Sequence, residues 1–316
     1  MLEKILSFYT RLFVIWVTIF AVVAYFLPGP FVAVKGAMNW FFALTMFGIG
    51  AVLEIGDFKK IAAKPGIVLV GTCGQFTIMP LGAFVISRLL HLPPEVTVGL
   101  ILTGSAPGAM ASNVMSYLSG ADTAYSVSLT TVSTLLCPVL TPGLTLLLAG
   151  SVLEVDFWGM VLSVLQMVIA PLFVGFIVRY WLGTRVKKVL SIFPAISVTF
   201  IIFICSLVVA MNRDYILMLT AAIFAAVIIL NLYGMLAGYS VGRIFQMHPA
   251  RRKTLAIEIG MQNAGLGTVL ALKHFSPRTA VPAAVFVFVC ILTASVMAAL
   301  WQTNTRPHDV DNNTAY

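Results

Sequence analysis

Apolar stretches of about 20 residues recur almost from one end of this 316-residue chain to the other, with short polar breaks between them. About 20 helical residues cross the hydrocarbon core of a bilayer, where each backbone N–H and C=O group must find its partner within the protein. Only 9% of the residues are charged, whereas a soluble domain carries about a quarter. The sequence therefore predicts an all-α polytopic membrane protein surrounded by the lipid bilayer.

Ten transmembrane helices are predicted within a single membrane domain, residues 1–301, followed by a polar cytoplasmic tail, residues 302–316. The first apolar run resembles a signal peptide, but the many later spans favour a first transmembrane helix. The predicted spans are approximately 12–27, 38–53, 66–90, 96–119, 123–150, 158–182, 192–211, 215–241, 254–273 and 279–301.

The positions of lysine and arginine predict which side each loop faces, because cytoplasmic loops hold more positive charge. With the N-terminus inside, 14 of the 19 lie in inner segments, and both termini are cytoplasmic. The other five lysine and arginine residues lie in outer segments: Lys35, Arg88, Arg213, Lys273 and Arg278. The positive residues behind the net charge of +8 lie in the breaks between spans rather than on one face, so no nucleic-acid partner is expected.

Ten spans divide into two sets of five, and an odd number of crossings gives the second set the opposite orientation. We expect an inverted repeat, with repeat one at about 11–150 and repeat two at about 157–301. Gln75 and Asn231 occupy similar places in the third and eighth spans, although chance similarity between two small-residue helices is an alternative. Transporters with such repeats place their sites at broken helices in corresponding positions.

The fourth span contains a run of small and polar residues, Gly104 to Asn113, with Pro107 in its middle. Proline removes an N–H group and glycine loosens the helix, so backbone groups become free within the membrane. Protein, water or an ion must satisfy them. The run predicts a broken helix that could hold an ion, or a simple proline kink satisfied by neighbouring helices.

The ninth span contains Glu258, the only acidic residue that we place within a predicted span. A charged side chain deep in a bilayer costs about 3 kcal/mol or more and usually marks a functional site. Gln262 and Asn263 follow it, with Gly260 and Gly265 nearby, so this helix is also predicted to be broken. The alternative is an interfacial glutamate paired with a lysine, Lys253.

Oxygen-bearing side chains elsewhere in the spans could complete a cation site around this glutamate. Ser126 and Thr130, spaced i and i+4, share one face of the fifth helix. Carboxylate, amide and hydroxyl oxygens suit a hard cation such as Na⁺, although a lone serine or threonine in a span more often serves helix packing. Cysteine and histidine show no spacing typical of a metal centre, so no cofactor is expected.

Three motifs identify a resemblance: Ala111 to Tyr117, Ser126 to Pro142, and Ala256 to Leu266. In these residues the chain resembles the bile acid:sodium symporter family, in its bacterial branch. The resemblance implies core and panel domains, crossed broken helices four and nine, two Na⁺ as coupling ions, and a place in the bacterial inner membrane. It implies one sodium site at Ser112, Asn113, Ser126, Thr130 and Glu258, and a second at Gln75, Glu258 and Gln262 with the carbonyls of Ile259 and Met261.

At the positions expected to contact the substrate, this sequence differs from the bacterial relatives that bind bile acids. Their His-Asn pair in the tenth span aligns with Cys290 and Ile291, and a threonine of the fourth span is replaced by Met110. These changes favour a small hydroxy or keto acid as the substrate, such as pantoate or ketopantoate, which one subgroup of the family transports. A bile acid or other steroid-like anion is the alternative. The candidate substrate contacts are Asn263, Met110, Cys290 and Thr293.

These features predict a sodium-coupled symporter that moves an organic anion by alternating access. A channel is compatible with broken helices, and saturable, sodium-dependent flux would separate the two classes. An intramembrane enzyme would need a nucleophile with a base, or a metal dyad, and no histidine or second carboxylate falls within the predicted spans.

Overall fold

The computed structural model describes residues 12–54, 64–183 and 192–303, together with residues 6, 8–10, 56–58 and 61. Regular structure in these residues is helical, apart from one isolated β-bridge. The first half contains α2 (Phe13–Phe26), α3 (Pro28–Ala33), the 3₁₀ helix η1 (Lys35–Ala37), α4 (Met38–Val52), α6 (Pro65–Leu89), α7 (Pro94–Gly104), α8 (Ala111–Leu118) and α9 (Thr123–Ala149).

The second half begins after residue 150 and is also helical. It contains α10 (Phe157–Val164), the π-helix η2 (Leu165–Ile169), α11 (Ala170–Leu182), α13 (Phe193–Met211), α14 (Arg213–Ile244), α15 (Pro249–Gly260), α16 (Ala264–His274) and α17 (Pro277–Thr303). Among the described helices, six stretches are long and apolar enough to cross a membrane.

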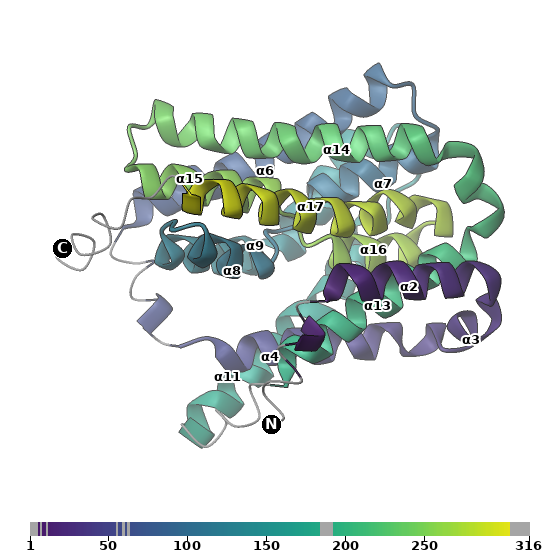
Figure 1. Ribbon diagram of the computed structural model, residues 1–316, viewed down its shortest axis with the longest axis horizontal. Coiled ribbons are helices and arrows are strands. Elements are labelled where there is room, and N and C mark those ends of the chain that lie inside the picture. The colour runs from purple at the N-terminus through teal and green to yellow at the C-terminus, as the bar shows by residue number, and fades with distance from the viewer. Residues whose placement is uncertain are drawn as a thin grey trace.

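The helices form two groups that lie side by side in Figure 1. The first group contains α2, α4, α11 and α13, and the second contains α6 to α9 and α14 to α17. Glycine allows backbones in the first group to touch, since a Cβ atom at Gly50 would lie 1.9 Å from the carbonyl oxygen of Leu172. Small residues of this kind let membrane helices pack closely.

Two helix interruptions lie against each other within the second group. Residues 105–110 separate α7 from α8, and residues 261–263 separate α15 from α16. The N–H of Ala109 donates to the carbonyl of Met261 at 2.9 Å, and the N–H of Asn263 donates to the carbonyl of Pro107 at 2.8 Å. The interruptions occur where the sequence predicts them, and part of the freed backbone is satisfied by the opposite interruption rather than by an ion.

Several bounds differ from the predicted ones. Helix α15 begins at Pro249, five residues before the predicted start, because His248 accepts the N–H of Ala250 and proline suits the first helical turn. Helices α3 and η1 occupy a connection that was expected to be a loop. The predicted tail, 302–316, begins inside α17, and residues 304–316 lie outside the described residues.

Candidate cation site and adjoining cavity

Glu258 lies in the last turn of α15, two residues before the helix ends at Gly260. Its exposed fraction is 2%, so the carboxylate is enclosed by protein. A buried charge needs hydrogen-bonding or ionic partners, because leaving water costs much free energy. The identity of those partners decides what this site can bind.

Three hydroxyl groups from two other helices surround the carboxylate. Ser112, in the first turn of α8, donates to Oε1 at 2.5 Å. Thr130 of α9 donates to Oε2 at 3.0 Å and lies 3.2 Å from Oε1. Ser126, one turn earlier on α9, also donates to Oε1. The i, i+4 spacing therefore points both α9 hydroxyls at one carboxylate.

Asn113 joins this cluster through the same two hydroxyls. Its Oδ1 lies 2.8 Å from the hydroxyl of Ser126 and 3.3 Å from that of Thr130. The predicted alternative, a pair between Glu258 and Lys253, is not formed. Instead, Lys253 donates to the carbonyl of Ser119 at 3.4 Å and lies 5.7 Å from the ring centroid of Trp301.

The second predicted ligand set is also brought together, through hydrogen bonds among its own members. Nε2 of Gln75 donates to Oε1 of Gln262 at 2.6 Å, and Nε2 of Gln262 donates to the carbonyl of Ile259 at 3.0 Å. The carbonyl of Met261 accepts the N–H of Ala109. In this arrangement, the oxygens of Gln262, Ile259 and Met261 each accept a hydrogen bond.

Sequence reasoning missed two side chains beside Glu258, those of Thr72 and Ser133. Ser133 accepts the N–H of Gly108 at 3.3 Å, and a Cβ atom at Gly108 would lie 2.8 Å from Oε2 of Glu258. Thr72 and Ser133 line a small hollow together with Gln75 and Glu258. The sequence does contain a clue: Thr72 lies three residues before Gln75, and Ser133 lies three residues after Thr130, a spacing that places each pair on one helix face.

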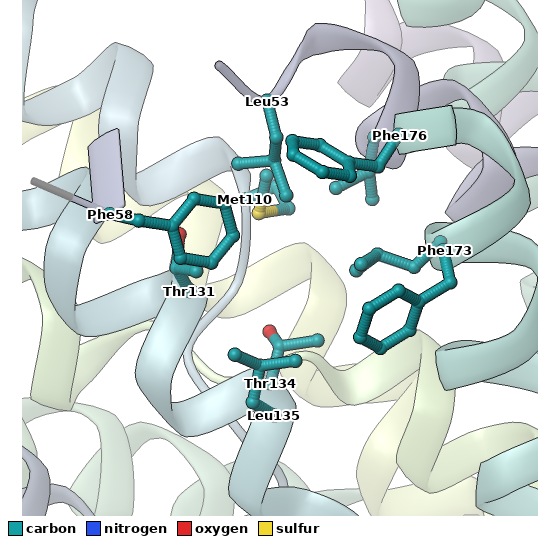
Figure 2. A pocket seen from close by; sticks show the side chains of 10 residues that line it. Leu53, Phe58, Met110, Thr131, Thr134, Leu135, Phe173 and Phe176 are labelled. Carbon is teal, nitrogen blue, oxygen red and sulfur yellow. The ribbon is translucent and has the colours of Figure 1, made fainter. Parts of the chain in front are cut away.

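A larger cavity lies between the two helix groups, beside the start of α8. Its volume is about 490 Å³, open mouth included. Figure 2 shows the rings of Phe58, Phe173 and Phe176 around it, with Met110 at its wall and the hydroxyl of Thr134 directed inward. The ten lining residues are all uncharged: Ile49, Leu53, Phe58, Met110, Thr131, Thr134, Leu135, Leu172, Phe173 and Phe176.

Of the four predicted substrate contacts, Met110 is among the residues that line the cavity. Asn263 caps α16 by accepting the N–H of Leu266 at 3.1 Å. Cys290 is 3% exposed and Thr293 is partly buried, and both bond to carbonyls of their own helix, α17. Neither is among the residues that line the cavity, because this part of α17 packs against other helices.

The oxygen-only donor set around one buried carboxylate suits a hard monovalent cation. Comparison with known proteins agrees with this chemistry. The sequence profile described as Sodium Bile acid symporter family matches residues 40–219, which is more than half of the chain. The chain belongs to this family.

Members of known name share most of the chain's length. An uncharacterized sodium-dependent transporter of Bacillus subtilis (strain 168), YocS, is 41% identical over 96% of this chain and 95% of its own. A probable chloroplastic sodium/metabolite cotransporter of Arabidopsis thaliana, BASS1, is 36% identical over 92% of this chain and 73% of its own. Family membership makes the chain a membrane transport protein rather than an enzyme.

Proposed function

We propose that the protein is a sodium-coupled symporter that moves an organic anion, with two Na⁺, by alternating access. One observation carries the proposal: a buried carboxylate, Glu258, gathers hydroxyls from α8 and α9 within hydrogen-bonding distance. When a cation binds, these hydroxyls turn their protons away and offer lone pairs, as a serine or threonine oxygen can do. The carboxylate supplies the charge that a buried cation needs.

The two ligand sets share Glu258, which supports the coupling of two cations. The first set is Ser112, Asn113, Ser126, Thr130 and Glu258. The second set combines Gln75, Glu258 and Gln262 with the carbonyls of Ile259 and Met261. Binding there requires the amides of Gln75 and Gln262 to exchange their mutual hydrogen bond for the ion.

An inverted five-plus-five repeat of ten helices explains how two interruptions come to face each other. Gln75 and Asn231 are 156 residues apart, and each donates to a carbonyl at an interruption, that of Ala106 at 3.4 Å or that of Gly260 at 2.8 Å. Gly104 and Gly260, also 156 residues apart, pack against Met79 and Met235, which have the same separation. These matched contacts support the repeat.

The cavity supports a site for the organic anion between the two helix groups, which correspond to the panel and core domains. It lies next to α8, and the N-terminal ends of α8 and α16 carry partial positive charge that favours a carboxylate. Because its lining is uncharged, the bound sodium ions and the helix ends balance the anion's charge. Our lead substrate is a small hydroxy or keto acid, such as pantoate or ketopantoate; a bile acid is the alternative.

We place the protein in a bacterial inner membrane with both termini in the cytoplasm, in agreement with the distribution of lysine and arginine. The cavity then opens near the cytoplasmic ends of α4 and α11. Two Na⁺ with a monovalent anion carry one net positive charge. About 100 mV supplies roughly 2.3 kcal/mol, and two tenfold sodium gradients add about 2.8 kcal/mol, enough to accumulate the anion several thousandfold.

The test is sodium-dependent thermal stabilisation of the purified protein, with KCl at equal ionic strength as the reference. We expect NaCl to raise the melting temperature, since an ion that binds only the folded state stabilises it. Glu258→Gln should abolish this response and sodium-driven uptake, whereas Glu154→Gln, which changes an exposed carboxylate, should leave both intact. Full sodium-driven uptake by Glu258→Gln would refute the proposal.

The substrate is identified by repeating the measurement in NaCl with small hydroxy acids, keto acids and bile acids. A pantoate-like acid should raise the melting temperature further, and more so in NaCl than in KCl. Stabilisation by an acid in KCl alone would contradict the coupling. Flux that does not saturate with the acid would indicate a channel.

A further inference from the structure

A second side of the buried carboxylate faces a small hollow. Among the described residues, Oε1 of Glu258 accepts from the hydroxyls of Ser112 and Ser126, while Oε2 accepts only from Thr130. A carboxylate oxygen has room for two partners. The hollow is lined by Gly71, Thr72, Gln75, Leu129, Ser133 and Glu258.

Thr72 is the unusual member of this lining. Its exposed fraction is 5%, yet its hydroxyl has no hydrogen-bond partner among the described residues. Several other buried threonines donate to the carbonyl four residues earlier, as Thr45 and Thr145 do. A buried hydroxyl without a partner is costly. A binding partner in the hollow would remove that cost.

Two further oxygens in the lining are available to a cation. Both N–H groups of the Gln75 amide are engaged, with Ala106 at 3.4 Å and Gln262 at 2.6 Å, which leaves Oε1 as an acceptor. The hydroxyl of Ser133 donates to the carbonyl of Thr130 at 3.1 Å and keeps a lone pair besides the one that accepts Gly108. The lining therefore offers three neutral oxygens beside one carboxylate oxygen.

We infer that Thr72 is a sodium ligand, and that one of the two coupling ions binds in this hollow. Four of its ligands are the hydroxyls of Thr72 and Ser133, Oε1 of Gln75 and Oε2 of Glu258. The hollow has no room for a water molecule, and a water would leave the carboxylate charge uncompensated, whereas the smaller sodium ion satisfies the hydroxyl of Thr72 and neutralises the carboxylate. This inference rests on the sodium coupling proposed above and adds two side chains to its second ligand set.

The experiment titrates NaCl against the melting temperature of purified wild type, Thr72→Val, Thr72→Ser and Thr77→Val. Valine has the shape of threonine without the hydroxyl, serine keeps the hydroxyl, and Thr77 is an exposed threonine of the same helix. We expect Thr72→Val to raise the half-saturating sodium concentration about tenfold, as the loss of one contact with a charged partner does. Thr72→Ser and Thr77→Val should stay within about twofold of wild type.

Equilibrium binding of radioactive sodium gives an independent count. At about ten times the half-saturating concentration of wild type, Thr72→Val should bind about half an ion fewer per chain, because a tenfold weaker site is then only half occupied, while Thr72→Ser binds as many as wild type. If Thr72→Val does not fold, Thr72→Ala, which also lacks the hydroxyl, takes its place. Wild-type affinity and ion count in the folded variant that lacks the hydroxyl would overturn this inference alone. No sodium response in wild type would overturn the sodium coupling itself.

Discussion

Gly108 and Glu258 approach so closely that a side chain at position 108 would displace the carboxylate. A Cβ atom at position 108 would lie 2.8 Å from Oε2 of Glu258, and the N–H of Gly108 donates to Ser133 at 3.3 Å. The α7–α8 interruption thus fixes the carboxylate from a side that bears no side chain. This contact connects the backbone break to the chemistry of the site.

Replacing Gly108 with alanine should weaken sodium binding more than it weakens folding. The added methyl group pushes the carboxylate away from the hydroxyls of α8 and α9, because neither backbone can yield easily inside a packed core. We expect at least a tenfold rise in the half-saturating sodium concentration in thermal titrations. Gly143→Ala, whose Cβ would lie 3.8 Å from its nearest neighbour Phe157, is the control. An unchanged sodium response in Gly108→Ala would show that the carboxylate can move without loss.

Asn231 should matter for stability although it lies outside both ligand sets. Its amide donates to the carbonyl of Gly260, at the end of α15, at 2.8 Å. Asn231→Leu leaves that buried carbonyl without its partner, which costs about 1–3 kcal/mol. We expect a lower melting temperature with and without sodium. Ser240→Ala removes an exposed hydroxyl of the same helix and should have little effect; equal melting temperatures for both variants would contradict the role of Asn231.

Phe176 should affect the substrate and leave sodium binding unchanged. Its ring lines the cavity and contacts Phe58 edge to face, with 5.7 Å between ring centroids. Phe176→Ala removes apolar surface that the organic anion would contact, worth about 1–3 kcal/mol. Uptake assays should therefore show a KM at least fivefold higher, with an unchanged sodium titration. Phe224→Ala, at a partly exposed ring of α14, is the control, and a wild-type KM in Phe176→Ala would exclude this cavity as the substrate site.

Much of the candidate site was predictable because the membrane makes polar residues conspicuous. Glu258 is the only acidic residue within a predicted span, and the Pro107 region breaks an otherwise apolar helix. Both signals follow from the cost of polar groups in lipid. The i, i+4 spacing of Ser126 and Thr130 then identifies which hydroxyls share a face, and both reach the carboxylate.

The remaining features depend on contacts between distant helices, which local spacing alone does not establish. Thr72 lies three residues before Gln75, but only the structure leaves its hydroxyl without a partner among the described residues, in a hollow that Glu258 also lines. Alignment with a polar pair predicts Cys290 at the substrate, and in the structure its thiol donates to the carbonyl of Val287 in its own helix, α17. Alignment specifies where a residue lies along a helix. The packing of that helix against its neighbours decides what the side chain of that residue contacts.

His274 links the end of α16 to α10. Its Nε2 lies 2.8 Å from the hydroxyl of Ser163 in α10. The residue follows the ninth predicted span, and burial lowers its pKa below the ordinary histidine value; the charge of Lys273 lowers it further, while Asp156 opposes the change. The folded protein therefore favours the neutral imidazole.

Stability should consequently fall as the pH drops below about 6.5, the pKa of an unfolded-chain histidine. Below that value the unfolded chain binds a proton at His274 more readily than the folded chain does, so protonation favours unfolding. Above it the imidazole is neutral in both states, and the full stability is present. His274→Gln cannot titrate, so its melting temperature should fall less than that of wild type between pH 7.5 and about pH 5. His91→Gln, in which an exposed histidine is replaced, is the control. Parallel melting curves for wild type and His274→Gln over this range would show that the contact with Ser163 does not depend on the charge of the imidazole.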